Sequence, residues 1–291
     1  MSSLSAHARA VFGSGAKAPQ SHSRRGARLT RLFIHFSIIS MKALRSAIER
    51  NIVIRSQANK SFDPASEGTP ETEWSAFLNG FQDWQPKRGP LVVLAPHPDD
   101  EILGAGGLIH DWAHQGLPVT IISVTDGEAA DLGRPGLDLI RREELQQALR
   151  KLCSVHVVVK RLGIPDGKVQ EHANRLRNAL ESHADSAGTL VVPYECDGHP
   201  DHEAVGKMGI ELAAANGAAI ARYPIWAWHR ARPSELATLP WKRFRLSLDA
   251  QRAKSRAIQC FESQLHPPRG SPIVPPNVLA YFARSFEAFI A

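Results

Sequence analysis

Short apolar runs alternate with longer helical patterns from Leu91 onward, and this alternation limits the possible fold more than any other feature of the sequence. The expected strands are Leu91–Leu94, Val119–Val124, Val155–Val159, Leu190–Val192 and a weaker Ala219–Tyr223. The segments between them have apolar residues at i, i+3 and i+4, as amphipathic helices do: Glu101–Gln115, Leu137–Leu152, Glu171–His183 and His202–Ala215. Strands rich in continuous Val and Ile are typically covered on both faces. The order therefore predicts an α/β fold, a Rossmann-like, doubly wound and mainly parallel sheet with helices on both faces.

The remaining chain is less regular. Arg243–Leu248 is a possible further strand, Asp249–Glu262 a helix opened by an Asp N-cap, and His266–Pro276 a Pro-rich loop. We expect three segments: 1–40 as a disordered or mis-called basic extension, 41–88 as an N-terminal lead-in, and 89–291 as the functional domain.

The charge of the chain is uneven. The whole sequence has 35 Lys and Arg against 29 Asp and Glu, but residues 1–40 contain six basic residues and no acid. The rest of the chain is therefore neutral. The basic surplus lies in the tail and gives no reason to expect nucleic-acid binding by the folded domain.

The first 40 residues leave several interpretations open. The apolar patch Leu32–Ile39 is interrupted by His35 and Ser37 and is too short for a membrane span. An Arg- and Ser-rich, acid-poor segment suits an organellar targeting peptide, while a disordered extension or a true start at Met41 is the simpler interpretation. Elsewhere no apolar run approaches a membrane span, so we expect a soluble protein without a transmembrane segment.

Cysteine usage points to the compartment. Cys153, Cys196 and Cys260 are an odd number without C-x-x-C spacing. This indicates a reducing environment without a disulfide framework, and we expect a cytoplasmic protein.

Two clusters of His and Asp follow predicted strands. His97-Pro98-Asp99-Asp100 comes just after the first strand, and Gly198-His199-Pro200-Asp201-His202 just after the fourth. In open α/β sheets the functional crevice lies outside the carboxyl ends of the strands. We therefore expect both clusters at the same edge.

These clusters contain the donors of a catalytic metal site. Two imidazoles and one carboxylate leave a fourth position open on zinc, whose ligands lie about 2.0–2.2 Å away. His97 and Asp100 can converge on one ion, and His202 would complete the set. Such an ion lowers the pKa of bound water toward about 7 and polarises a carbonyl.

The remaining polar residues fill the other roles of amide hydrolysis. Asp99 is adjacent and can deprotonate the water without being a ligand. His199 can donate to the tetrahedral oxyanion or to the leaving amine, with Asp201 orienting it.

Structural explanations compete with this one. Asp99, Asp100 and Glu101 could be N-cap and first-turn acids, although that explanation does not account for a second His-Pro-Asp cluster. Cys196 is a conceivable soft ligand but is better explained as a small buried thiol. Four further histidines fall on presumed helix faces and are expected to be solvated: His110, His114, His172 and His183. The glycines Gly104, Gly106 and Gly107 lie inside a helix and lack dinucleotide-loop spacing.

The two motifs together, Ala95–Glu101 and Gly198–His202, resemble the signatures of the PIG-L/LmbE-like family of zinc-dependent N-deacetylases. The resemblance spans Leu91 to about Leu265 and includes further stretches: Thr125–Glu128, Arg141–Leu145, Leu162–Gly167 and Ser263–Gln264. It implies that 89–291 is a deacetylase domain with zinc on His97, Asp100 and His202. The same ligand set also tolerates Fe2+ or Co2+.

The resemblance also implies the reaction. Asp99 would be the general base, and His199, supported by Asp201, would stabilise the oxyanion and protonate the leaving amine. Arg141 and Asp166 match positions that face the sugar in relatives. The implied partner is a small-molecule or glycoconjugate substrate of the N-acetylglucosaminyl type, converted to free amine and acetate.

Substrate identity is less constrained. The aromatics of Tyr223–His229 could stack on a sugar or an apolar aglycone, or pack in the core. Two alternative functions remain: an amidase acting on another N-acyl or thiol-conjugate substrate, and a non-catalytic metal- or sugar-binding module. Retention of Asp99 and His199 disfavours the binding module, since a binder needs only the three ligands.

Overall fold

The computed structural model describes residues 64, 66–131, 133–153, 157–184 and 188–291. The predictions for 1–40 and for half of the lead-in 41–88 lie outside these residues, and the three segment boundaries stay predictions. Within the described residues, no helix combines the length and apolar character needed to cross a bilayer.

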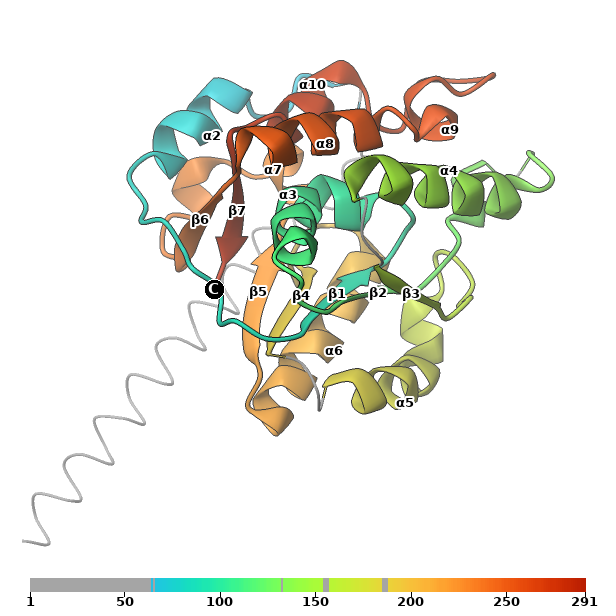
Figure 1. The fold of residues 1–291 in the computed structure, drawn as a ribbon. Coiled ribbons are helices and arrows are strands. Elements are labelled where there is room, and N and C mark those ends of the chain that lie inside the picture. Colours follow the sequence, from blue (N-terminus) through green and yellow to red (C-terminus); the bar gives the residue numbers. More distant parts are fainter. Residues whose placement is uncertain (1–63, 65, 132, 154–156, 185–187) are drawn as a thin grey trace, which may run out of the picture. The chain divides into compact units, whose positions relative to one another are not determined.

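The described strands form one sheet of seven, in the order β3-β2-β1-β4-β5-β7-β6 (Figure 1). Five of them are mutually parallel: β1 Leu91–Ala95, β2 Val119–Ser123, β3 Val158–Arg161, β4 Thr189–Pro193 and β5 Ala219–Tyr223. The strand β7 (Phe286–Ile290) pairs antiparallel with both β5 and β6 (Trp241–Arg245). The predicted mainly parallel sheet is confirmed, with an antiparallel pair added at one side.

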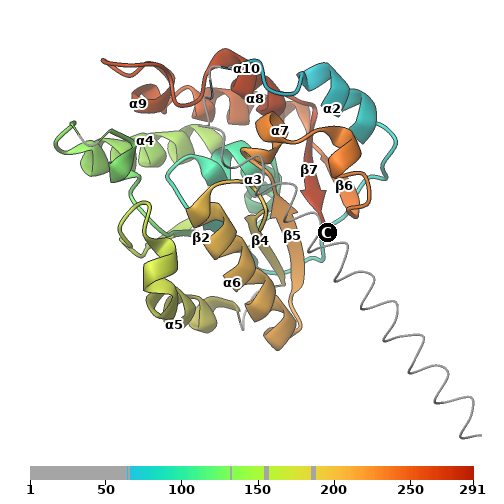
Figure 2. The same ribbon diagram turned by 180° about the vertical axis from the view of Figure 1, so that it is seen from behind.

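Helices cover both faces of this sheet (Figures 1 and 2). One face carries α3 (Asp100–His114), α4 (Leu137–Leu152) and α8 (Leu248–Ile258), and the other carries α5 (Ala173–Ala184) and α6 (Pro200–Asn216). Shorter helices complete the described chain: α2 Glu71–Leu78, α7 Ala227–Arg230, α9 Glu262–Leu265, α10 Pro276–Leu279, and the 3-10 turns η1 Glu128–Asp131, η2 Val169–His172, η3 Pro233–Glu235 and η4 Ala280–Phe282. The doubly wound architecture is therefore confirmed.

The central strand β1 shows why its sequence is apolar throughout. Side chains alternate between the faces of a strand. Leu91 and Val93 pack in the core beneath α3, whereas Val92 and Leu94 pack in the core beneath α6. A strand covered on both faces needs no polar positions, and all five residues of β1 are buried.

Several local predictions differ from the structure. The third strand begins at Val158, later than the predicted Val155, and residues 154–156 lie outside the described part. The N-cap of α8 is Ser247, whose Oγ accepts from the Ala250 N–H at 3.0 Å, and Asp249 lies in the first turn. His110 was expected to be solvated but is buried, because α3 lies between the sheet and α8.

The lead-in contributes to the core. Trp74 on α2 is fully buried, with its ring 4.9 Å from that of Trp228 and 6.3 Å from that of Trp241. Its indole Nε1 donates to the Trp228 carbonyl at 2.7 Å. These contacts attach the described part of the lead-in to the antiparallel side of the sheet.

Candidate functional site

Two loops meet at one edge of the sheet because β1 and β4 are parallel neighbours, with Leu91 opposite Thr189. The chain leaves β1 at Ala95 and enters α3 at Asp100, whose N-cap is Asp99. It leaves β4 at Pro193 and enters α6 at Pro200. The structure thus brings the two His-Pro-Asp clusters together, as the topology predicted.

Three donor atoms form a nearly equilateral triangle at this edge. His97 Nδ1 lies 3.2 Å from Asp100 Oδ2 and 3.2 Å from His202 Nε2, and His202 Nε2 lies 3.2 Å from Asp100 Oδ2. The backbone N–H of His97 also donates to Asp100 Oδ2 at 2.9 Å, which fixes that carboxylate. All three residues are buried. The triangle is small enough for one ion to contact all three atoms.

Carboxylates fix the orientation of both imidazoles. His97 Nε2 lies 3.0 Å from Asp166 Oδ1 and 3.4 Å from Asp201 Oδ2. His202 Nδ1 lies 2.8 Å from Asp197 Oδ2. In each ring one nitrogen is held by a carboxylate outside the triangle. A proton on that nitrogen would leave the other nitrogen, on the triangle side, free to ligate an ion.

Asp197 was not singled out from the sequence, although it directly precedes Gly198, the first residue of the second cluster. Its buried carboxylate accepts from His202 and also from three successive backbone N–H groups, those of Ile225, Trp226 and Ala227, each at 2.9 Å. These donors follow β5, nearly thirty residues along the chain. No periodicity in the sequence marks such a contact.

His199 lies beside the triangle. Its ring centroid is 4.8 Å from that of His97 and 4.8 Å from that of His202. The Asp201 backbone N–H donates to His199 Nδ1 at 3.2 Å, which leaves Nε2 as the protonated nitrogen. Burial and the neighbouring His202 and His97 lower the pKa of His199 to about 3. His199 is therefore a neutral imidazole with one N–H available to donate.

The Asp201 carboxylate is placed differently from expectation. It accepts from the backbone N–H of Gly167 at 2.7 Å and of Val169 at 3.1 Å, and it faces His97. Its contact with His199 is made by its backbone. Asp201 therefore joins the second cluster to the loop that follows β3.

Asp166, expected to face a sugar, also has a structural contact. Besides His97, it accepts from the Ala129 N–H at 3.0 Å. Burial opposes its ionisation, but the His97 contact keeps the pKa of Asp166 below its usual range. It lines the cavity described below and orients His97 at the same time.

The environment of Asp99 favours a proton near neutral pH. Burial first, and then the charge of Asp100, raises the pKa of Asp99 to about 7, although Arg141 opposes this shift. Arg141 Nη2 lies 3.7 Å from Asp99 Oδ2, and Arg141 Nη1 donates to the Gly127 carbonyl at 2.8 Å. Asp99 also has a backbone φ of 152°, a conformation that non-glycine residues rarely adopt and that is often found at functional sites.

The pKa values of the neighbouring groups follow their contacts. Burial lowers the pKa of His202, but the contacts with Asp100 and Asp197 outweigh it and raise the value to about 9. Burial likewise opposes protonation of His97, whereas Asp100, Asp166 and Asp201 raise its pKa well above the usual range. Both rings therefore strongly attract positive charge, as a proton or as an ion.

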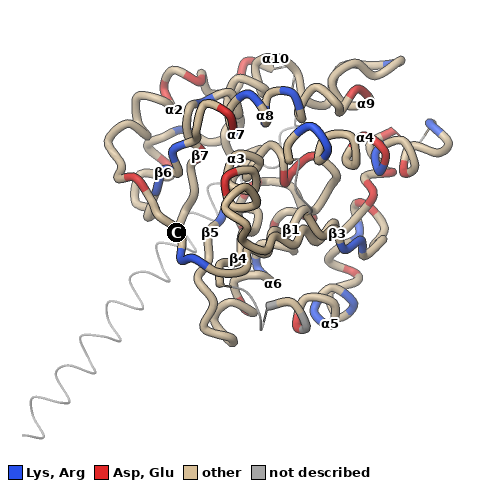
Figure 3. The backbone as a smooth tube through the Cα atoms, in the orientation of Figure 1, with Lys and Arg blue, Asp and Glu red and all other residues tan. Residues whose placement is uncertain are grey.

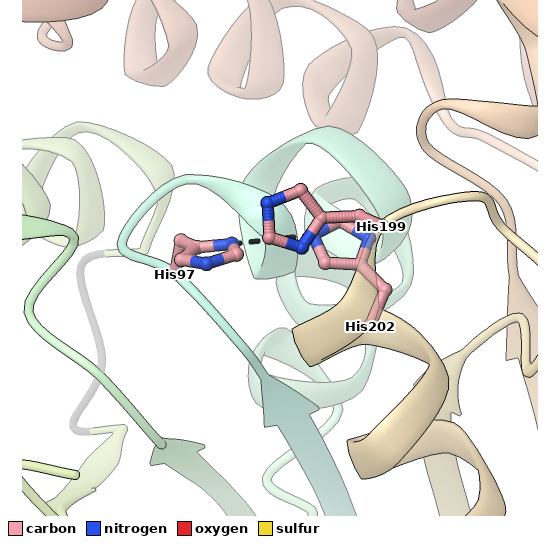
Figure 4. A group of neighbouring side chains, drawn as sticks. All are labelled: His97, His199 and His202. Atoms are coloured by element: carbon pink, nitrogen blue, oxygen red, sulfur yellow. Dashed lines mark hydrogen bonds between the residues drawn. The ribbon is translucent and has the colours of Figure 1, made fainter. Parts of the chain in front are cut away.

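Two further groups of donors could hold an ion, and both include His97. One is the trio of His97, His199 and His202, whose rings point toward one another in Figure 4, and the other is His97, Asp166 and Asp201. In the second group, however, His97 would use the nitrogen that already contacts Asp166. A ligand set that uses His97 Nδ1 keeps this contact intact.

A cavity of about 390 Å³ opens on these residues. Its polar wall contains His97, Asp99, Asp100, Arg141, Asp166, His199 and Gln264. This volume lies within the range of roughly 300–1,000 Å³ that small-molecule pockets occupy. The site can therefore enclose a small ligand next to the donor triangle.

Two other stretches with motif resemblance meet behind this wall. The Glu144 carboxylate accepts from the Ser263 N–H at 2.7 Å and from its hydroxyl at 2.6 Å. Gln264 Nε2 donates to the Pro98 carbonyl at 2.9 Å. These contacts tie α4 and α9 to the loop that carries Asp99.

Residues 92–213 match the model of a protein family described as PIG-L, GlcNAc-PI de-N-acetylase. The chain is 26% identical over 224 residues to a 1D-myo-inositol 2-acetamido-2-deoxy-alpha-D-glucopyranoside deacetylase of Corynebacterium diphtheriae, covering 60% of this chain and 75% of that relative. It is 32% identical over 131 residues to a probable N-acetyl-alpha-D-glucosaminyl L-malate deacetylase 2 of Bacillus subtilis, covering 41% of this chain and 58% of the relative. The second likeness thus spans little more than half of the relative.

Among solved structures, the chain resembles a conserved protein from Thermus thermophilus with a TM-score of 0.52 and 26% identity. The likeness covers 69% of this chain and 93% of that one. The family match includes both His-Pro-Asp clusters and ends within α6.

Proposed function

We infer the function of this protein from its membership of the PIG-L family of de-N-acetylases, to which residues 92–213 belong: it is a metal-dependent hydrolase that removes the acetyl group from an N-acetylated amino sugar. The products are the free amine and acetate. The observation that carries the proposal is the triangle of His97 Nδ1, Asp100 Oδ2 and His202 Nε2, each pair 3.2 Å apart.

We propose that this triangle holds zinc. A tetrahedral ion with ligands at about 2.0–2.1 Å separates them by about 3.3–3.4 Å. The three observed separations of 3.2 Å are close to this value and leave a fourth position open. Histidines whose second nitrogen contacts a carboxylate are the usual ligands of such ions. When bound, the zinc would polarise the amide carbonyl and lower the pKa of a water molecule, as Fe2+ or Co2+ could also do.

Asp99 is suited to act as the general base. Its carboxylate lines the cavity beside Asp100, and its pKa of about 7 permits both proton uptake and release. As a water oxygen bonds to the acyl carbon, Asp99 accepts a water proton. The resemblance gives protonation of the amine to His199, but the single N–H of His199 faces the oxyanion in this proposal. We therefore assign delivery of the proton to the amine nitrogen, as the C–N bond breaks, to Asp99.

His199 is suited to stabilise the oxyanion. Its neutral ring has Nδ1 occupied by the Asp201 N–H, so its Nε2–H is available to donate to the oxygen that develops negative charge. Asp201 fixes this tautomer through its backbone. Removing one oxyanion donor typically costs about 100- to 1,000-fold in kcat.

Arg141 and Asp166 are proposed to contact the sugar from the cavity wall. Arg141 lines the cavity, and its buried Nε has no hydrogen-bond partner among the described residues. For Asp166 the support is weaker, because its carboxylate is already engaged by His97 and the Ala129 N–H. We assign Asp166 first to positioning His97.

The test is amine and acetate release from N-acetylglucosaminyl compounds by the purified full chain. Activity should be lost when a chelator removes the metal and should return when one equivalent of zinc is added. The control is the same chelator treatment followed by Mg2+, which prefers oxygen ligands and should not restore activity. Release by protein shown to be free of metal would refute the metal role. Zinc-loaded, folded protein that hydrolyses no member of the panel would refute the deacetylase assignment.

A further inference from the structure

The cavity beside the donor triangle has two unlike walls. Besides the polar wall defined above, the cavity is lined by six apolar side chains, which we call the apolar wall: Leu103, Ile225, Trp226, Ile273, Val274 and Val278. A sugar ring presents hydroxyl groups that need polar partners. An apolar wall of this extent therefore exceeds what the sugar ring alone requires.

Most of the apolar wall comes from chain outside the family match. Five of its six residues follow residue 213, where the match ends. They belong to two stretches, residues 223–229 and 270–283, that contain no Asp, Glu, Lys or Arg. In Figure 3 the second stretch, around α10, has neither the blue of Lys and Arg nor the red of Asp and Glu. The lack of charge along the apolar wall thus comes mainly from the C-terminal third of the chain.

The same stretches are anchored to the catalytic residues. Asp197, which contacts His202, also accepts the backbone N–H groups of Ile225 and Trp226. The N–H of Ile273 donates to the Gln264 carbonyl at 2.9 Å, and Gln264 contacts the loop before Asp99. The apolar wall therefore has a fixed position relative to the donor triangle, as a specificity surface needs.

We propose that the amino sugar this protein deacetylates carries an apolar aglycone, an alkyl or aryl group that packs against the apolar wall. The inference rests on the proposed deacetylase function. Relatives named above act on an inositol and on a malate conjugate, both with polar aglycones. Among the described residues that line the cavity, Arg141 is the single Lys or Arg, and it already contacts Gly127 and Asp99. A dicarboxylate would find little to pair with there.

An apolar group could instead belong to the acyl part of the substrate's amide. Both named relatives are deacetylases of acetylated glucosaminyl compounds, so their common part is the acetamido sugar and their difference is the aglycone. The apolar wall likewise comes mainly from outside the family match. We therefore assign the apolar wall to the aglycone rather than to the acyl group.

The experiment compares two substrate series with zinc-loaded full-length protein. The first lengthens the aglycone from methyl to butyl to octyl on N-acetylglucosamine, and the second lengthens the acyl group from acetyl to octanoyl on the methyl glycoside. We expect kcat/KM to rise at least about tenfold from methyl to octyl glycoside, since each buried methylene favours binding. Lengthening the acyl group should not raise it. Equal rates along the first series, or a preference for octanoyl, would overturn the inference.

A matched pair of variants locates the effect. Ile273→Ser changes a partly buried residue of the apolar wall, and Ile220→Ser changes a partly buried isoleucine that packs on the opposite side of the sheet. The octyl-to-methyl ratio of kcat/KM should fall about fivefold in Ile273→Ser, because a serine restores little apolar contact. It should be unchanged in Ile220→Ser. A ratio unaffected by Ile273→Ser would place the aglycone elsewhere and refute the assignment.

A binding measurement tests this inference independently of the proposed function. If no glycoside were hydrolysed, calorimetric affinities of the octyl and methyl glycosides for the zinc-loaded protein would still differ by about tenfold under the inference. Equal affinities would overturn it. A tenfold difference without turnover would instead refute the deacetylase function and leave the apolar subsite supported.

Discussion

Helix α3 connects two buried charged clusters that differ in how their charge is balanced. At its middle, Lys254 and Glu287 form a closed pair, with Lys254 Nζ 2.7 Å from Glu287 Oε1 and 2.8 Å from the Leu103 carbonyl. Glu287 also accepts the backbone N–H groups of Gly107 at 2.7 Å and Leu108 at 2.9 Å. Each charge in this pair has its counter-charge and its hydrogen bonds.

The cluster at the helix N-terminus is not balanced in this way. Around the donor triangle lie six buried or largely buried carboxylates: Asp99, Asp100, Glu101, Asp166, Asp197 and Asp201. Apart from the rings of His97 and His202, the cation in contact with them is Arg141, 3.7 Å from Asp99. Uncompensated negative charge in a buried place requires protons or a bound cation. The difference between the clusters separates a binding site from a structural ion pair better than burial alone, because both clusters are buried.

The largest expected effect at the donor triangle comes from substituting the proposed general base, Asp99. In Asp99→Asn we expect kcat to fall by about 1,000-fold or more, because loss of a positioned base costs about 100- to 10,000-fold. The zinc content should stay at that of the wild type, since Asp99 is not among the triangle residues. Asp111→Asn is the control: Asp111 lies on the same helix and accepts from Ser247, away from the cavity. Wild-type turnover in Asp99→Asn would contradict the mechanism.

Breaking the closed pair should affect folding instead. Lys254→Met leaves Glu287 buried with its charge unpaired, and we expect the free energy of unfolding to fall by about 3 kcal/mol. Urea unfolding measures this change. The double variant Lys254→Met/Glu287→Gln should recover part of the loss, because no lone charge remains. Zinc affinity in both variants should stay within about twofold of wild type, whereas a large loss of affinity would show that the two clusters act as one.

Asp197, which contacts His202 from outside the triangle, should affect metal binding more than it affects turnover by the zinc-loaded enzyme. In Asp197→Asn we expect zinc affinity to fall by about 10- to 100-fold, the usual effect of losing the carboxylate partner of a ligating histidine. Competition with a chromogenic chelator measures it. Asp126→Asn is the control, because Asp126 also follows a parallel strand but contacts arginines. Equal affinities in the two variants would count against His202 as a ligand.

Much of the fold follows from local sequence pattern. The apolar run of β1 and the helical spacing of α4 are each decided within their own segment, and α4 begins and ends at the predicted residues. The parallel order then places the segments after β1 and β4 at one edge, so the residues of the triangle could be named in advance.

The features that sequence reasoning missed depend on distant partners. Asp197 has its role because the N–H groups of residues 225–227 face it. Glu287 interrupts an otherwise apolar strand, β7, and is stable there because Lys254 reaches it from α8. Asp166 was expected to face substrate, yet its carboxylate contacts His97. Such pairings depend on tertiary packing and leave no periodic signal in the chain.

A third cluster, in which Arg142 and Arg161 pair with Asp126 and Arg142 also pairs with Asp138, gives the smallest expected effect. Asp126 Oδ1 accepts from Arg161 Nε at 2.9 Å, and Asp126 Oδ2 accepts from Arg142 Nη2 at 2.7 Å. Burial opposes ionisation, but the contacts with Arg142 and Arg161 lower the pKa of Asp126. Because both arginines are partly exposed, solvent screening limits the stabilisation to about 1 kcal/mol.

The pH dependence of this cluster follows from the direction of that shift. A carboxyl whose pKa is lower in the folded state stabilises the fold above its unfolded value, near about 3.9, and loses that contribution as pH falls through the folded value. The free energy of unfolding of Asp126→Asn should therefore lie about 1 kcal/mol below wild type at pH 7, with the gap narrowing below about pH 4. Urea unfolding of both proteins at pH 7 and at pH 3.5 measures the gap, and comparing the two cancels the other titrating groups. A gap that is the same at both values would mean that the asparagine disturbs packing rather than charge. In that case, the pairing of charges would not explain how the clusters of this protein differ.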